Sequence, residues 1–388
     1  MEIPESDLDL WSDQAILDPY PLYRELRDTA GAVLLARYGM FALTRYADVR
    51  DALHLWRPFS SAHGVMMNDH INEALRGIML CSDPPEHDVL RGVARRPMMP
   101  RELKPLEPLI HEEAEKLVDR LVAQRSFDAA TELAQYLPVT IVSKLVGLPE
   151  EGREQMLDWA RANFNCFGPM NARAEQSLPV LRDAMAYCTD PTLRQRLKPG
   201  GWAARLYEAA DAGEIPHGQA GIMLNDYWAP SLDTTIMAIG SAIRLFGEHP
   251  DQWDLLRANP RLISQAINEV VRLESPIQMF SRLLIGDYEV GGATLPRGSR
   301  VVVVFASANR DERKWPDPER FDVNRQPSDH VAFGWGEHQC MGMPLARLEM
   351  RALLTALAAR VRRFEIAATE PLMNNVLHGP RRLEVVVS

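Results

Sequence analysis

A glycine-rich segment around one cysteine constrains this chain more than any other feature. It reads FGWGEHQCMG from Phe333 to Gly342, and a helical pattern of apolar residues begins directly after it. Glycine tolerates positive φ, so the segment can turn tightly and bring backbone N–H groups close to Cys340. The start of the following helix adds positive potential, which favours a thiolate. Such a thiolate is suited to bind a soft or borderline metal ion.

The composition excludes several other classes of protein. The 388 residues include 43 Lys and Arg against 53 Asp and Glu, giving a formal net charge of −10, and only four cysteines. This acidity argues against a general nucleic-acid binder, and four cysteines are too few for a secreted disulfide scaffold. The N-terminus lacks the basic start and apolar run of a signal peptide, and no stretch of about 18 apolar residues occurs. We therefore expect a cytoplasmic protein that binds neither nucleic acid nor membrane.

Apolar periodicity predicts a mainly helical protein. Spacings of three and four residues run from Asp83 to about Gly247 and return from Met343 to about Arg360. They include one long helix that begins at about Gly218. Alternating residues at 32–46 and around Gly-Gly in 287–305 predict β-hairpins, and the run VVVVFASA predicts a buried strand. No repeat or flexible linker interrupts the chain, so we expect a single domain over residues 1–388 with a minor β-rich part.

The cysteine segment resembles the haem-binding signature of the cytochrome P450 family, Phe-Gly-x-Gly-x-His-x-Cys-x-Gly. The resemblance extends over essentially the whole chain and implies the cytochrome P450 fold of the soluble bacterial class. It also implies that Cys340 is the axial ligand of haem b. A thiolate in this position favours O–O cleavage at the iron. All six specified positions match: Phe333, Gly334, Gly336, His338, Cys340 and Gly342.

The same resemblance assigns structural and haem-binding roles to charged residues. Glu269 and Arg272 match the family's Glu-x-x-Arg pair, and Arg320 in WPDPERFDVNR is expected to be the third member of a buried Glu-Arg-Arg cluster. On a helix, positions i and i+3 share a face and can form an ion pair. The expected partners of the haem propionates are His87 and Arg91, one helical turn apart, together with Arg282 and His338.

The segment MLNDYWAPSLDTTIMAIG contains the expected catalytic residues. Asp233 and Thr234 match the acid–alcohol pair that the family places over the iron. The resemblance implies that Thr234 hydrogen-bonds dioxygen or its water and that Asp233 relays protons. Pro230 departs from the family pattern, which has glycine or alanine there. A proline inside a helix removes one N–H donor and clashes with the carbonyl of Asp226, so we expect a distortion that opens the oxygen pocket.

Several segments resemble the bacterial branch that hydroxylates and O-demethylates para-substituted benzoates. These are FNCFGPMNAR, LKPGGW, ESPIQMFSR and NNVLHG. Phe164 and Phe167 match two pocket phenylalanines that flank a planar ring in that branch. Met279 and Phe280, in ESPIQMFSR, are expected to line the same pocket. The resemblance therefore implies a small aromatic substrate.

The positions that anchor a benzoate carboxylate have changed in this chain. His63 replaces an arginine, and Asp226 and Ala229 replace two serines. Asp226 precedes Asp233 by seven residues, about two helical turns, so both are expected on one face. A carboxylate there repels a benzoate and prefers a hydrogen-bond donor such as a phenol or amine. We expect a small neutral aromatic, such as a methoxyphenol, oxidised at its methyl ether or alkyl group.

The electrons must come from separate proteins, because the chain has no flavin segment and no four-cysteine iron–sulfur set. We expect NAD(P)H to supply them through a ferredoxin reductase and a ferredoxin, to a monomeric enzyme. A basic patch of Arg95, Arg96, Arg101, Lys104 and Arg347 could dock the ferredoxin, although solvated helix ends explain these residues equally well.

Other functions remain open at this point. They are a peroxide-using haem-thiolate enzyme, a hydroxylase of an unrelated hydrophobic small molecule, and a non-catalytic haem sensor. The Asp233–Thr234 pair favours an enzyme that uses dioxygen over the first and last of these. Cys81, Cys166 and Cys188 are expected to be ordinary thiols.

Overall fold

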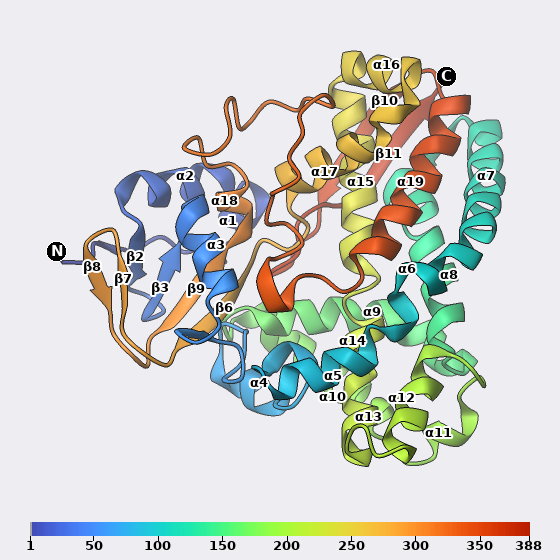
Figure 1. Ribbon diagram of the computed structural model, residues 1–388. Coiled ribbons are helices and arrows are strands. Elements are labelled where there is room, and N and C mark those ends of the chain that lie inside the picture. Colours follow the sequence, from blue (N-terminus) through green and yellow to red (C-terminus); the bar gives the residue numbers. More distant parts are fainter. Residues whose placement is uncertain (1) are drawn as a thin grey trace.

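Two predicted hairpins form in the β-rich part of the molecule, on the left in Figure 1. In the first, Gly39 adopts a φ of +61° in the turn between two antiparallel strands. The computed structural model, which describes residues 2–388, builds these strands into a six-stranded sheet of order β1-β2-β3-β9-β6-β4. The strands are β1 Glu5–Ser6, β2 Ala32–Leu35, β3 Met40–Leu43, β4 Phe59–Ser60, β6 Met279–Leu284 and β9 Arg300–Val304.

The apolar run from Val301 is a buried strand only in its first half. Residues 301–304 lie within β9 between β3 and β6, and all four valines are 0% exposed. The chain then forms a short helix, α18 Phe305–Ala308. The second predicted hairpin is also present, with both turn glycines at positive φ. It comprises β7 Tyr288–Val290 and β8 Ala293–Leu295, while a third sheet contains β5 Ser126–Asp128, β10 Phe364–Pro371 and β11 Pro380–Val387.

The larger helical part, on the right in Figure 1, follows the predicted periodicity closely. The helix before Gly147 ends where this glycine adopts a φ of +77°, and the helix after the cysteine segment has the predicted bounds. Helices outside the interrupted segment described next are α1 Asp13–Leu17, α2 Tyr20–Thr29, α3 Tyr46–His54, α4 Asp69–Ala74, α5 Glu86–Ala94, α6 Pro100–Leu103, α7 Glu107–Gln124, α8 Tyr136–Val146, α9 Glu150–Phe167, α10 Ala172–Cys188, α11 Leu193–Arg196, α12 Trp202–Asp211, α16 Pro250–Ala258, α17 Ile263–Glu274 and α19 Met343–Arg360.

The long helix predicted from about Gly218 is not continuous. It consists of α13 His217–Met223, α14 Asn225–Trp228 and α15 Asp233–Glu248. Pro230 lies in the gap between the last two, where its missing N–H prevents regular pairing. Two hydroxyls replace lost donors: Ser231 donates to the carbonyl of Tyr227, and Thr234 donates to the carbonyl of Pro230 at 2.8 Å. The prediction of one helix is therefore wrong, whereas the distortion predicted from Pro230 is present.

The predicted ion cluster on α17 has a different third member. Arg272 Nε lies 2.7 Å from Glu269 Oε2, and both side chains are 0% exposed. Arg325 Nε contacts Glu269 Oε1 at 3.0 Å, whereas Arg320 is exposed. Arg325 also donates to backbone carbonyls of residues 316, 317 and 320, so the folding of this loop directs its side chain inward. The prediction that Arg320 is the third member of the cluster is therefore wrong, and Arg325, five residues later, takes that place.

No helix within residues 2–388 is long and apolar enough to cross a bilayer.

Candidate active site

The cysteine segment forms the tight loop that its glycines predict. The N–H of Cys340 donates to the carbonyl of Phe333 at 2.8 Å. Gly336 adopts a φ of +71°, and a Cβ at this position would lie 2.8 Å from the carbonyl oxygen of Leu53. Because that approach is closer than any side chain permits, only glycine fits here. The loop thereby fixes Cys340 directly before α19.

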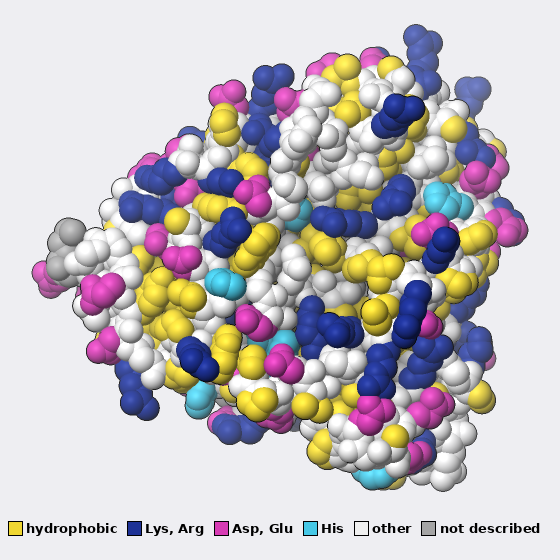
Figure 2. Space-filling model, viewed as in Figure 1, with side chains coloured by type: hydrophobic (Ala, Val, Ile, Leu, Met, Phe, Trp, Pro, Cys, Tyr) yellow, Lys and Arg dark blue, Asp and Glu magenta, His cyan; other side chains and the backbone are white. Residues whose placement is uncertain are grey.

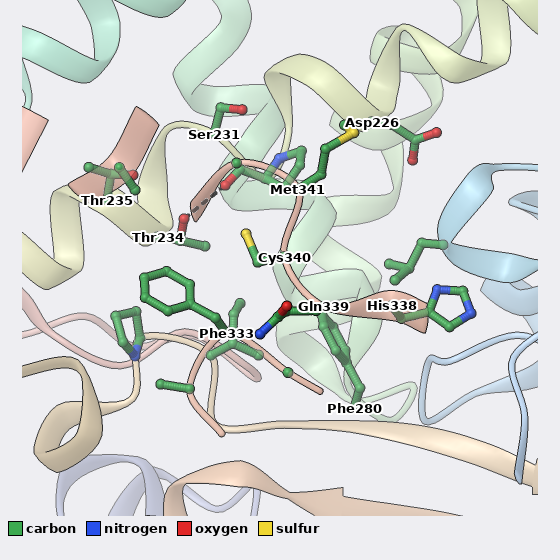
Figure 3. A pocket seen from close by; sticks show the side chains of 18 of the residues that line it. Asp226, Ser231, Thr234, Thr235, Phe280, Phe333, His338, Gln339, Cys340 and Met341 are labelled. Atoms are coloured by element: carbon green, nitrogen blue, oxygen red, sulfur yellow. Dashed lines mark hydrogen bonds between the residues drawn. The ribbon is translucent and has the colours of Figure 1, made fainter. Parts of the chain in front are cut away.

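The environment of the Cys340 sulfur contains groups that favour a thiolate. Burial raises the pKa of this thiol, while N–H groups of Gly342 and Met343 and the charges of Arg91 and Arg347 act in the opposite direction. A bound metal cation would lower the pKa further. Although it lies deep in the molecule, the thiol is exposed to a cavity, which Figure 3 shows. The sulfur is therefore free to bind a ligand in that cavity.

The four predicted propionate partners form one basic cluster beside the cysteine loop. The rings of His87 and His338 have centroids 4.3 Å apart, and their Nε2 atoms have no partner among residues 2–388. Arg282 is 3% exposed and, within residues 2–388, donates only to the carbonyl of Ser281, whereas Arg91 donates to the carbonyl of Gln339 at 2.5 Å. Arg91, Arg282 and His338 line the cavity, and His87 lies behind His338.

This cluster has the charge that an anionic group of the cofactor requires. Burial is the main cause that lowers the pKa of all four side chains, and it brings that of Arg282 to about 10. In the described part of the chain, the one carboxylate within ion-pair distance of them is Asp88, 3.4 Å from His87, while Asp83 acts on Arg282 from farther away. Buried cations without counter-ions are unfavourable. The cluster therefore fits two propionates, and the exposed thiol fits an iron ligand, so the residues present fit haem.

Asp233 and Thr234 face different surroundings. Thr234 lines the cavity, whereas Asp233 is 0% exposed and lies 3.4 Å from Arg161 Nε on α9. Burial raises the pKa of Asp233 to about 7, although Arg161 acts to lower it. Asp226 lines the cavity and Asp233 does not, so the prediction that they share a face is wrong. The reason is the interruption around Pro230, which ends the regular rotation of 100° per residue.

Four of the seven predicted pocket residues line the cavity. Phe164 and Phe167 are in edge-to-face contact with centroids 5.5 Å apart, and Phe280 lies 6.1 Å from Phe167. These phenylalanines come from α9 and β6, and Asp226 comes from α14. They give the cavity an aromatic wall, and Asp226 adds a carboxyl group to the same cavity. This arrangement can enclose a planar apolar molecule.

The other three predicted pocket residues lie elsewhere. His63 is exposed at a turn closed by the Gly64 N–H to Ser61 carbonyl bond, so it does not reach the cavity. Met279 precedes Phe280 on β6 and therefore points to the opposite face, where it packs in the core. Ala229 is 1% exposed and packs among the core helices. These three predictions are wrong.

The sequence interpretation missed several polar residues of the cavity, among them two asparagines and a glutamate. Asn163 and Asn225 line it next to predicted residues, and neither of their side-chain oxygens has a partner within residues 2–388. Glu349, on α19, also lines it, and burial raises its pKa to about 8. The sequence does contain a signal for Glu349. It lies three residues after Ala346 and four after Leu345, which also line the cavity, and residues with these spacings share one face of a helix.

The fold and the cysteine loop define a protein of the haem-thiolate class, and comparisons with known proteins agree. The family model described as Cytochrome P450 matches residues 242–380. Cytochrome P450 CYP199A2 of Rhodopseudomonas palustris is 35% identical over 99% of this chain and 94% of its own length. Linalool 8-monooxygenase of Pseudomonas putida is 30% identical over 90% of each chain.

A solved structure shows the same fold at full length. Cytochrome P450 CREJ in complex with (4-ethylphenyl) dihydrogen phosphate superposes with a TM-score of 0.86 at 25% identity, covering 96% of this chain and 98% of the other. This chain belongs to the cytochrome P450 family. It is a haem-thiolate monooxygenase that uses haem b and dioxygen, with electrons from NAD(P)H.

Proposed function

We propose that this cytochrome P450 inserts one oxygen atom into a small aromatic compound, by hydroxylation or by O-demethylation of a methoxyphenol-like or other para-substituted substrate. The observation that carries this proposal is the cluster of Phe164, Phe167 and Phe280 in the cavity that contains Cys340. Edge-to-face and tilted ring contacts suit a planar guest. The aromatic ligand of the CREJ structure and the resemblance to benzoate-oxidising enzymes support the same substrate class.

The residues of the cavity divide into holding and proton-handling groups. Cys340 would bind the haem iron, and the basic cluster of His87, Arg91, Arg282 and His338 would hold the propionates. When bound, haem supplies the iron centre that activates dioxygen. The phenylalanines would orient the substrate and exclude water from the cavity. Proton delivery falls to the remaining pair on α15, Asp233 and Thr234.

Asp233 would take up and release protons while Thr234 positions them at the cavity. The hydroxyl of Thr234 already donates to the carbonyl of Pro230, which fixes its side-chain orientation. Asp233 has one carboxyl oxygen without a hydrogen-bond partner within residues 2–388, and its pKa is raised to about 7 by burial. A carboxyl group with this pKa can exchange protons near neutral pH. Arg161 acts as the positioning residue that holds it.

We expect Asp233→Asn to lower product formation by roughly a hundredfold, the lower range for loss of a general acid–base group. Substrate affinity, measured by the shift of the haem Soret band, should stay unchanged because Asp233 does not line the cavity. The wild type should show a limb in its pH–rate profile near pH 7, where Asp233 loses its proton as pH rises, and the variant should lack it. The matched control is Asp158→Asn, which removes an exposed carboxylate on α9: it should keep the rate and the limb, with the limb shifted to lower pH because Asp158 raises the pKa of Asp233. Equal rates in both variants would contradict the proposed role.

The substrate class is tested with a series of methoxyarenes. The holoenzyme, supplied with NADPH and a surrogate ferredoxin system, should release formaldehyde from compounds such as para-methoxyphenol. Binding should shift the Soret band, because a ligand in the cavity that contains Cys340 changes the surroundings of the haem. If no methoxyarene shifts the band while larger aliphatic compounds do, the proposal of an aromatic substrate is wrong.

We also propose that a ferredoxin docks over the helices that surround the cysteine loop. Figure 2 shows Lys and Arg side chains gathered over α5, α6 and α19. Arg95 and Lys104 are exposed without a side-chain ion pair within residues 2–388, whereas Arg96 and Arg101 pair with Glu214 and Glu102. A local excess of positive charge on an acidic protein would steer an acidic electron donor to this face.

A further inference from the structure

We propose that Asp226 binds the polar end of the substrate and selects an aromatic compound that carries a hydrogen-bond donor there, a phenol O–H or an amine N–H, over a benzoate. This inference rests on the proposed oxidation of aromatic compounds and adds the second functional group of the substrate. Asp226 and Cys340 line the same cavity. In the view of Figure 3, Asp226 lies on the opposite side from Thr235, with Cys340 between them.

Asp226 has acceptor capacity that the protein does not use. Its side chain is 7% exposed, and Oδ2 accepts one hydrogen bond, from the N–H of Met79 at 3.2 Å. Within residues 2–388, no other group hydrogen-bonds to this carboxyl and no cation pairs with it. A carboxylate can accept about four hydrogen bonds. A donor on a ligand in the cavity would therefore find a free acceptor.

Two neighbouring amides add polar groups to the same cavity. Asn163 is 1% exposed and Asn225 is 3% exposed, and both line the same cavity. In the described part of the chain, the Oδ1 atom of each lacks a partner. Buried polar groups in folded proteins normally have partners, so unsatisfied ones at a cavity indicate a polar ligand. Asp226 therefore supplies the acceptor, while Asn163 and Asn225, from α9 and α14, add amides that can donate or accept in the cavity that the phenylalanines also line.

The charge balance of the cavity separates the candidate ligands. A benzoate would place a second carboxylate in a poorly solvated cavity with Asp226, and like charges there repel strongly. An ammonium group would form an ion pair with a charge-assisted hydrogen bond, and a phenol would donate from an uncharged O–H, so neither ligand adds a like charge. The cations Arg91 and Arg282 also line the cavity, but they belong to the basic cluster beside His338.

The protonation state of Asp226 gives a further readout. Burial raises its pKa to about 7, opposed only by the Met79 N–H. The titratable groups that interact with it electrostatically are Cys81 and Tyr227, and both stay neutral near this pH because burial raises their pKa values, that of Cys81 to about 12. An ammonium ligand prefers the ionised carboxylate. Its binding should tighten as pH rises through about 7 and then level off.

The experiment compares three ligands that differ only at the polar end. Soret titration of the holoenzyme gives dissociation constants for para-methoxybenzylamine, para-methoxyphenol and para-methoxybenzoate. We expect the wild type to bind the amine and the phenol more tightly than the benzoate, with the separation between amine and phenol showing which donor fits best. Asp226→Asn should weaken the amine by about tenfold or more and abolish the pH dependence of its binding. Asp226→Ser, which removes the charge, should tighten the benzoate.

The controls separate this inference from the proposed function. Asp158→Asn removes an exposed carboxylate on α9 and should leave all three constants unchanged. Haem content and thermal unfolding check that each Asp226 variant is folded. The order of the three dissociation constants in the wild type is a test that needs no variant. If the wild type demethylates all three ligands but prefers the benzoate, the proposed function stands and this inference is overturned. If none of the three binds, both are overturned.

Discussion

Cys340→His yields a protein that binds haem weakly or not at all and loses monooxygenase activity to background, together with the thiolate-type band in the reduced-CO difference spectrum. The physical reason is that imidazole does not donate electron density to iron as a thiolate does. The N–H groups of Gly342 and Met343 that point at the sulfur would also lose their acceptor. The band is measured in the purified holoprotein, and activity as formaldehyde release.

A buried cysteine that does not line the cavity provides the matched control. Cys81 is 3% exposed, and burial raises the pKa of its thiol to about 12, so it has no thiolate character near neutral pH. Cys81→Ala should keep the thiolate-type CO band and most of the activity, with at most a loss of stability from the smaller side chain. A thiolate-type band retained in Cys340→His would contradict the assignment of the iron ligand.

The parts of the site that the sequence predicts well are those set by short-range rules. Gly336 is specified by its φ of +71°, which favours glycine, and Cys340 follows at a fixed spacing. His87 and Arg91 lie one turn apart on α5, so their shared face is also a local property. Local rules of this kind act within a few residues. They can be read without knowing where the rest of the chain runs.

The failures arise where long-range packing or an interrupted helix decides the outcome. Asp226 and Asp233 would share a face only if the helix between them were regular, and Pro230 prevents that. The resemblance places His63 in the pocket because it stands where the related branch has an arginine, but the turn that exposes it is set by contacts between distant segments, including the bond from Arg300 to its carbonyl. Met279 and Phe280 are neighbours on one strand, yet the first packs in the core and the second lines the cavity, because successive side chains on a strand point to opposite faces.

Arg325→Ala should destabilise the protein by roughly 3 kcal/mol, as expected when one partner of a buried ion cluster is removed. Glu269 is 0% exposed and would keep only Arg272 as a cationic partner. The three carbonyls that Arg325 reaches in residues 316–320 would also lose a donor. The loss is measured as a lower midpoint of urea unfolding, followed by the Soret band.

Arg320→Ala is the decisive comparison, because it removes the same side chain from a neighbouring position. Arg320 is exposed, and residues 2–388 provide no carboxylate that pairs with it. Its loss should therefore change stability by no more than about 0.5 kcal/mol. Glu269→Gln should cost more than either arginine variant, because it would leave both Arg272 and Arg325 without their counter-charge. If Arg320→Ala proves as destabilising as Arg325→Ala, the cluster is not closed by Arg325, and the family-based expectation regains its support.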